Sequence, residues 1–358
     1  MLLLPFLLPW TGPVAAQTPA GRPVLLAISK GDHTLAMVDA ATLTVLARMP
    51  VGEDPHEVVA SADGRTAYVS NYGGGSYHSL AVLDLVHRQA LPSIDLGLLR
   101  GPHGLDFADG KLWFTAEGAK AIGRLDPASG QVDWLLGTGQ DRTHMIYVAP
   151  DRSWIATTNV ASATVSLIEP APPQRRMSPP SGVAPPRLGG PRPPPRRMGP
   201  PPPPNPQGDW TETVIPVGRG SEGFDVSPDG REIWTANAED GTVSILNRAS
   251  HRVVATLQAN VRSANRLKFT LDGQRVLISS LGAPDLVVLD AASHRELKRI
   301  PIGTGAAGIQ MDPDGTRAFV ACSPDDSIAV VDLRTLTVTS RIHVGPEPDG
   351  LAWAVVPQ

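Results

Sequence analysis

Three histidines and one carboxylate occupy the same position in successive copies of a repeated segment. His56, His103 and His144 each stand at the start of a short apolar run, and Glu222 holds this position in the next copy. With nine histidines in the chain, three at one of roughly forty aligned positions would arise by chance about one time in fifty. Imidazole and carboxylate groups are ligands for zinc and other first-row divalent metals. The pattern therefore predicts a metal site formed by His56, His103, His144 and Glu222.

Such a metal would lower the pKa of a bound water and polarise an ester or lactone carbonyl. Glu222 would then be the fourth ligand or a general base, which makes it the catalytic candidate. The alternative is a water-filled polar mouth, where these side chains only bind solvent. The sequence contains no CxxCH haem-attachment motif, no phosphate-cradling glycine loop and no Ser–His–Asp arrangement. We therefore expect neither haem nor a nucleotide.

Further polar residues lie at or next to the same position in other copies. The candidates for ligand binding are Arg142, Arg262, Arg266, Asn265 and Asp349. Guanidinium groups hold a carboxylate or a phosphate through two parallel hydrogen bonds. The loops after the second strands add His33, Tyr72, Tyr77, His78, Glu117 and Asp240. We interpret each of these loop residues as solvated, because isolated polar loop residues usually are.

The elements that must position these residues come from a repeat of about forty residues. PHEVVASADGRTAYVSN (55–71) returns as SEGFDVSPDGREIWTAN (221–237) and as AAGIQMDPDGTRAFVAC (306–322). Short Val, Ile, Thr and Leu runs flank Asp-Gly pairs, which are strong β-hairpin signals. The fold class predicted is all-β, a seven-bladed β-propeller of four-stranded antiparallel blades.

The seventh blade must be assembled from both ends of the chain. Residues 349–355 form a first strand, and 24–29, 34–40 and 44–50 form the other three. A blade shared by the two ends closes the ring and leaves only short sheet edges. The innermost strand of each blade lines the central channel, so the aligned histidine position becomes a ring at the channel mouth.

The N-terminal residues lie outside the repeats, and the single cysteine lies apart from the predicted ring. Residues 1–20 combine an apolar run with Val14-Ala15-Ala16, which predicts a signal peptide and a periplasmic or secreted protein. The run is too short to span a bilayer, so no transmembrane segment is expected in the mature chain. The single cysteine, Cys322, lies in an apolar strand and is expected to be a core residue.

Residues 170–208 interrupt the propeller, which the sequence assigns to 21–169 and 209–358. This Pro/Arg-rich insertion holds 17 of the 37 prolines, six arginines and no acidic residue. Such a composition predicts disorder. The insertion is either a tolerated loop expansion or an arm that binds a protein partner. Without its +6, the net charge of −4 becomes −10, so nucleic-acid binding by the body is not expected.

The segments SPDGREIWTAN, GTVSILN and VIPVG resemble the YVTN-type family of seven-bladed propellers. That family includes exported YncE-like proteins and relatives of the propeller lactonases. The resemblance covers the chain except 1–20 and 170–208, and it implies the fold more strongly than the function. Three hypotheses follow: a propeller that binds a small ligand or divalent metal at its channel mouth, a metal-dependent lactonase or lyase-like hydrolase, and a protein-interaction scaffold.

Overall fold

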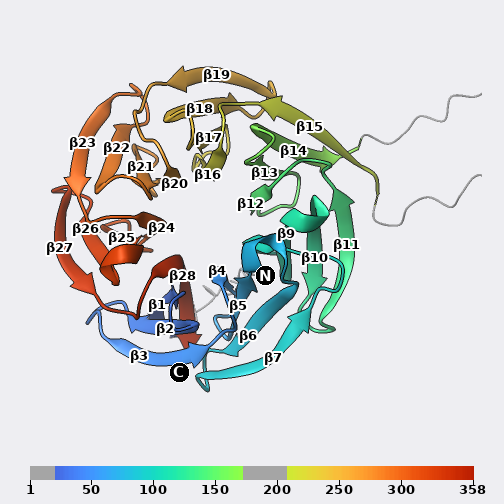
Figure 1. The fold of residues 1–358 in the computed structure, drawn as a ribbon, viewed down its shortest axis with the longest axis vertical. Helices are drawn as coiled ribbons and strands as arrows, with labels where there is room; N and C mark the ends of the chain where they lie inside the picture. Colours follow the sequence, from blue (N-terminus) through green and yellow to red (C-terminus); the bar gives the residue numbers. More distant parts are fainter. Residues whose placement is uncertain (1–20, 172–207) are drawn as a thin grey trace, which may run out of the picture.

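The computed structural model describes residues 21–171 and 208–358. These residues form seven sheets of four antiparallel strands, arranged as blades around a central channel (Figure 1). The chain is thus a seven-bladed β-propeller, as the sequence predicts. Strands are confined to short runs between tight turns, and the only helical segments in the described residues are the 3-10 turns η1 (Gly73–Gly75), η2 (Glu117–Ala119) and η3 (Ser323–Asp325).

The first three blades follow chain order from the channel to the rim. Blade 1 consists of β4 (Pro55–Ala60), β5 (Thr66–Asn71), β6 (Ser79–Asp84) and β7 (Gln89–Asp95). Blade 2 consists of β8 (Pro102–Ala108), β9 (Lys111–Ala116), β10 (Ala121–Asp126) and β11 (Gln131–Gly137). Blade 3 consists of β12 (Thr143–Val148), β13 (Ile155–Asn159), β14 (Thr164–Pro170) and β15 (Trp210–Pro216).

The remaining blades have the same organisation. Blade 4 consists of β16 (Ser221–Val226), β17 (Glu232–Asn237), β18 (Thr242–Asn247) and β19 (Arg252–Leu257). Blade 5 consists of β20 (Ala264–Phe269), β21 (Arg275–Ser280), β22 (Asp285–Asp290) and β23 (Glu296–Pro301). Blade 6 consists of β24 (Ala306–Met311), β25 (Arg317–Cys322), β26 (Ser327–Asp332) and β27 (Thr337–Ile342).

Blade 7 joins the two ends of the described chain. It consists of β28 (Pro348–Pro357), β1 (Gly21–Ser29), β2 (Thr34–Asp39) and β3 (Val45–Pro50). The C-terminal β28 is innermost and pairs antiparallel with β1 from Gly21↔Pro357 to Ser29↔Pro348. The predicted closure is confirmed. Strand β1 begins three residues before the predicted Val24, because β28 extends far enough to pair with Gly21.

The core lies between neighbouring blades rather than inside a single sheet. Second strands such as β9 and β17 are buried almost throughout, since both of their faces are covered by adjacent sheets. Their Trp113 and Trp234 are among the largest fully buried side chains. Outer strands such as β27 alternate exposed and partly buried residues, as one face meets solvent. Cys322 is fully buried in β25, which confirms its interpretation as a core residue.

The acidic or amide residue that ends most third strands caps the following turn. Asp84 Oδ1 accepts hydrogen bonds from the amides of Val86 and His87, each at 2.9 Å. Equivalent turns form at Asp39, Asn247, Asp290 and Asp332. Glu169 instead lies 3.3 Å from His251, because its longer side chain reaches the next blade. These residues shape turns.

Two sequence predictions concern residues that the structure does not describe. The predicted signal peptide (1–20) and nearly all of the predicted insertion (170–208) lie outside the described ranges. The two anchors of the insertion are described: β14 pairs with β15 as far as Pro170↔Trp210, and Ala171 N donates to Asp209 O at 2.7 Å. Among the described residues, no helix is long and apolar enough to cross a membrane.

Replacing Gly308 with Ala is expected to destabilise the propeller by about 1–3 kcal/mol. A Cβ at this position would overlap the backbone carbonyl oxygen of Asp349 on the neighbouring inner strand. Gly137, at the end of an outer strand, has no heavy atom within 4 Å of a built Cβ and serves as the control. Urea denaturation of both variants measures the difference. Equal stability of the two would contradict the close approach of β24 and β28.

Candidate functional site

The second residue of every inner strand lies at one cavity at the channel mouth. In blade order these residues are His56, His103, His144, Glu222, Asn265, Ala307 and Asp349. All seven line a cavity of about 450 Å³. The aligned position identified in the sequence is therefore a ring in space, which we call the mouth ring.

The mouth ring is held by a local bulge and by hydroxyl groups from the preceding blade. In blades 1 to 6, the pairing of the inner strand with the second strand shifts at the ring residue and its successor. Such bulges bend the strand and change the direction in which its side chains point. Hydroxyls then donate to the ring carbonyls: Ser70 to His103 (2.8 Å), Thr115 to His144 (2.7 Å), Thr158 to Glu222 (2.9 Å) and Ser279 to Ala307 (2.6 Å). Each of these blades thus positions the ring residue of the next one.

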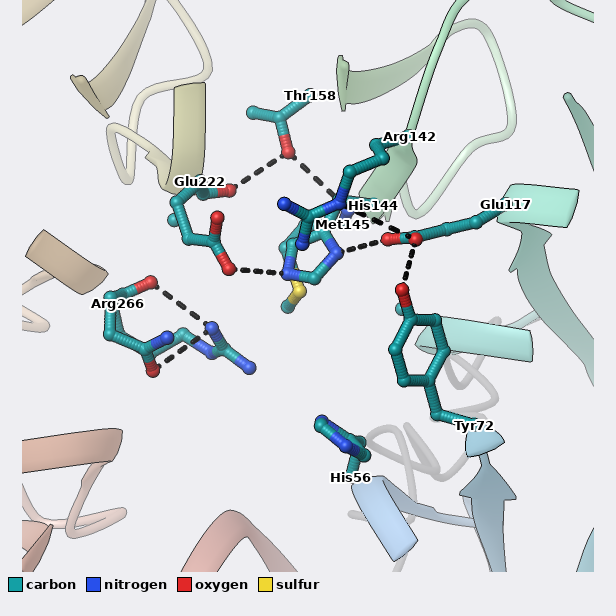
Figure 2. A network of polar contacts seen from close by, with 12 residues as sticks. His56, Tyr72, Glu117, Arg142, His144, Met145, Thr158, Glu222 and Arg266 are labelled. Carbon is teal, nitrogen blue, oxygen red and sulfur yellow. Dashed lines mark hydrogen bonds and ion pairs between the residues drawn. The ribbon is translucent and has the colours of Figure 1, made fainter. Parts of the chain in front are cut away.

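His144 lies between two carboxylates (Figure 2). Its Nδ1 contacts Glu117 Oε1, and its Nε2 lies 2.8 Å from Glu222 Oε1. Burial alone would lower the pKa of His144, but the charge of Glu222 and the contact with Glu117 outweigh it and raise the pKa to about 9. Burial raises the pKa of Glu222, but the charge and contact of His144, with smaller contributions from Arg266 and Arg142, outweigh it and lower the pKa to about 2. At neutral pH this is an imidazolium held by two carboxylates.

Glu117 connects this ion pair to blade 1 and to the rim of the cavity. Its Oε2 accepts a hydrogen bond from the Tyr72 hydroxyl at 2.6 Å and lies 3.6 Å from Arg142 Nε. Burial and the contact with Glu117 raise the pKa of Tyr72, so its hydroxyl stays protonated and donates. The network therefore runs from Tyr72 through Glu117 and His144 to Glu222, across blades 1 to 4.

His103 is the most isolated polar side chain of the site. It is 2 % exposed, its ring packs against that of His144 at a tilt of 31° with centroids 3.7 Å apart, and its Nδ1 has no hydrogen-bond partner among the described residues. Burial and the positive charge of His144 hold the pKa of His103 well below its usual range. A neutral imidazole thus packs directly against a charged one.

His56 forms a second polar group with residues of blade 7. Its Nε2 lies 2.8 Å from Lys30 Nζ and 3.1 Å from Asp54 Oδ1, and its Nδ1 lies 3.6 Å from Asp349 Oδ2. The hydrogen bond with His56 and the nearby Lys30 hold the pKa of Asp54 well below its usual range, despite its partial burial. In this part of the mouth, the cationic and anionic side chains therefore contact one another.

Arg266 and Glu57 close the channel beneath the mouth ring. Both follow the ring position by one residue, and they form an ion pair between blades 5 and 1. Four other blades have glycine at this position, where a Cβ would overlap the backbone of the next inner strand. A longer side chain here must therefore enter the channel. Arg266 and Glu57 also line a second cavity of about 320 Å³ further along the channel.

The predicted ligand-binding residues divide into those inside and outside the mouth cavity. Arg142, Arg266, Asn265 and Asp349 line it. Arg262 is not part of this lining in the described structure, because its guanidinium donates to the Glu239 carbonyl at 2.8 Å and packs against the loop after β17.

Sequence reasoning treated Tyr72 and Glu117 as solvated loop residues and did not consider Lys30. All three immediately follow the last residue of a second strand. The complete set at this position is Lys30, Tyr72, Glu117, Val160, Ala238, Leu281 and Ser323. Four of these residues, Lys30, Tyr72, Leu281 and Ser323, line the cavity, and Glu117 contacts His144. Aligning this second position would have revealed an additional ring.

The predicted metal ligands lie together but are not arranged around one point. In the described parts of the chain, no group of three or more His, Cys, Asp or Glu residues could hold a metal ion. His144 in particular does not fit, since both of its nitrogens face carboxylates and a protonated imidazole cannot ligate. These contacts leave His144 unavailable to a metal ion as the side chains stand, and the metal site at His56, His103, His144 and Glu222 is a prediction from the sequence alone.

Solved structures share this fold at low sequence identity. A candidate 6-phosphogluconolactonase of Bacteroides fragilis aligns with a TM-score of 0.70 and 14% identity, covering 96% of this chain and 100% of its own. A functionally unknown protein of Desulfotomaculum acetoxidans aligns with a TM-score of 0.69 and 12% identity, covering 94% and 99%. The dihydro-heme d1 dehydrogenase NirN, in complex with DHE, aligns with a TM-score of 0.59 and 16% identity, covering 94% and 66%.

No protein-family model and no curated protein sequence matches the chain. At these identities the structural likenesses show the propeller fold alone. Membership of the YVTN-type family stays a prediction, whereas the seven-bladed architecture that it implied is confirmed.

Proposed function

We propose that this protein binds a small anionic ligand, a carboxylate or a phosphate, at the channel mouth. The observation that carries the proposal is His103, which lines a cavity of about 450 Å³ and whose buried Nδ1 has no hydrogen-bond partner within residues 21–171 and 208–358. A buried polar atom without a partner is costly, and native structures retain it mainly where a ligand, water or function compensates.

The half-exposed guanidinium of Arg142 at the same cavity favours an anion. The Arg142 side chain is 47% exposed, and its Nε faces Glu117, which leaves donors on its other nitrogens. Lys30 also lines the cavity, but its charge is paired with Asp54 at 3.3 Å and Asp349 at 3.7 Å, so Arg142 is the cation that would bind the anion. Arginine is well suited to bind carboxylate or phosphate oxygens in pairs.

Replacing Arg142 with Gln is expected to weaken binding of the probe anions acetate and inorganic phosphate about tenfold or more, because a charged hydrogen bond contributes about 1.5–3 kcal/mol. Arg219→Gln is the control, since Arg219 is exposed and paired with Asp240 at 2.9 Å. Isothermal titration calorimetry measures both variants. Absence of saturable binding in the parent protein, or equal losses in the two variants, would overturn the proposal.

A hydrolase is the second candidate, and the histidine pair is the observation that favours it. Neutral His103 packs against protonated His144, which places a base beside an acid. In hydrolysis of an ester or lactone, His103 would take a proton from water as the oxygen attacks the carbonyl. As the C–O bond breaks, His103 would pass this proton to the leaving oxygen, because burial and the charge of His144 disfavour its protonated form. Glu222, the catalytic candidate from the sequence, would act by holding His144 charged.

Turnover of glucono-δ-lactone separates the two candidates. A hydrolase should lose activity in His103→Gln and keep it in His78→Gln, because His78 is an exposed residue paired with Asp95 at 2.7 Å. Lack of turnover by the parent protein, with saturable anion binding, would leave the binding function. A catalytic metal, export directed by residues 1–20 and a protein partner for 170–208 remain predictions from the sequence.

A further inference from the structure

The mouth cavity has two chemically different sides. Blades 7, 1, 2 and 3 contribute charged and aromatic groups: Lys30, His56, Tyr72, His103, Arg142 and His144. Blades 5 and 6 contribute Leu281, Ala307 and Pro324, which we call the apolar wall, beside the polar Asn265, Arg266 and Ser323. Blade 3, which carries Arg142, lies across the channel from blade 6 in the ring (Figure 1).

The apolar wall follows from residue choices at two aligned positions. Blade 6 places Ala307 in the mouth ring, where other blades place histidine, carboxylate or amide groups. Blade 5 places Leu281 directly after its second strand, at the position that holds Lys30 in blade 7. These two residue choices therefore place apolar surface on the blade 5 and blade 6 side of the cavity.

The loops that form the apolar wall pack closely on one another. Gly305 has a φ of 59°, and a Cβ there would lie 2.5 Å from Pro324 Cδ and 3.9 Å from the Leu281 carbonyl oxygen. Only glycine adopts this conformation without strain and leaves room for the neighbouring proline. The apolar wall is thus a packed surface, although Leu281 itself is 53% exposed.

We propose that the ligand is amphiphilic: its carboxylate or phosphate lies near Arg142, and a short alkyl or aryl group packs on Leu281, Ala307 and Pro324. The inference rests on the proposed function and adds the chemical class and orientation of the ligand. Covering a half-exposed leucine removes apolar surface from water, and each methylene buried on it should tighten binding about three- to fourfold.

The test compares acetate, butyrate and hexanoate by isothermal titration calorimetry at neutral pH. In the parent protein the dissociation constant should fall about tenfold or more from butyrate to hexanoate, for two further methylenes. In Leu281→Ser this dependence on chain length should largely disappear, while acetate binding stays unchanged. Leu297→Ser is the matched control, because Leu297 is 49% exposed on the outer strand β23 and should leave the dependence intact.

The outcomes separate this inference from the function on which it rests. Equal affinities for the three acids, with binding still lost in Arg142→Gln, would overturn the amphiphilic ligand and keep the anion site. Equal chain-length dependence in the parent and in Leu281→Ser would also overturn it, by placing the alkyl group elsewhere. Failure of all three acids and of inorganic phosphate to bind saturably would overturn both proposals.

Discussion

Deleting residues 349–358 is expected to abolish cooperative folding or to lower the melting temperature by at least about 10 °C. The deletion removes β28, the innermost strand of blade 7, with its buried Leu351, Ala352, Ala354 and Val356. Burial of these side chains alone contributes on the order of 5 kcal/mol. That is a large part of the stability of a typical protein.

The loss reaches beyond one blade because β28 also packs between blades 6 and 1. It contacts β24 on one side and β4 on the other, and its absence exposes the edge of β1. Removing only residues 357–358 is the control, since it deletes a single pair of the β28–β1 register. Differential scanning calorimetry compares the two truncations. Similar transitions for both would contradict a ring closed by β28.

The fold could be predicted because its signals are local and repeated. Asp-Gly turns such as Asp63-Gly64 and Asp229-Gly230 fix the register of the first hairpin in blades 1, 2, 4, 5 and 6. Once the hairpins align, the mouth ring follows from counting residues, and all seven ring positions do line one cavity. Closure by the C-terminal strand followed from the same count, because each end of the chain lacked the strands that the other supplied.

The contacts within the site could not be predicted, because they depend on side-chain reach between blades. Glu117 turns towards His144 of the next blade, and Tyr72 reaches Glu117 across the blade 1–2 boundary. A repeat alignment gives the position of a residue in its blade, but not the direction in which its side chain points. The metal hypothesis shows the consequence: the carboxylate of Glu117, absent from the predicted ligand set, occupies one nitrogen of His144.

Arg262 and Arg266 show that the repeat alignment also fails to predict side-chain direction at neighbouring positions. Both lie close to the start of an inner strand, yet Arg266 enters the channel and Arg262 binds a loop carbonyl. The difference arises because the position after the mouth ring has no space between blades. The glycines at four equivalent positions indicate this lack of space in the sequence.

The stability of the protein is expected to be greatest near neutral pH, with a loss on each side that comes from a different histidine. On the alkaline side, the folded-state pKa of His144 is about 9, above its unfolded value of 6.5. Its stabilising contribution is therefore complete below about pH 6.5 and is lost as the pH rises through about 9. The loss is on the order of 3 kcal/mol, since one pKa unit corresponds to about 1.4 kcal/mol.

On the acid side, the relevant group is His103. Its folded-state pKa lies well below 6.5, because burial and the charge of His144 disfavour the protonated form. The unfolded chain therefore takes up a proton that the folded protein cannot, and stability falls as the pH drops below about 6.5. Between about pH 6.5 and 4.5 this effect is separate from protonation of Glu222, whose folded-state pKa is about 2, and it is opposed by Asp106, whose burial raises its pKa to about 6.

Urea denaturation from pH 4.5 to 9.5 on three variants assigns each limb to its residue. His144→Gln should lower stability at neutral pH and flatten the alkaline limb, because no imidazolium remains to be lost. His103→Gln should flatten the acid limb and leave the alkaline limb in place. His78→Gln should change neither, since His78 is exposed at the edge of blade 1. An alkaline limb that persists in His144→Gln would show that His144 is not the buried cation on which the Glu117–His144–Glu222 network depends.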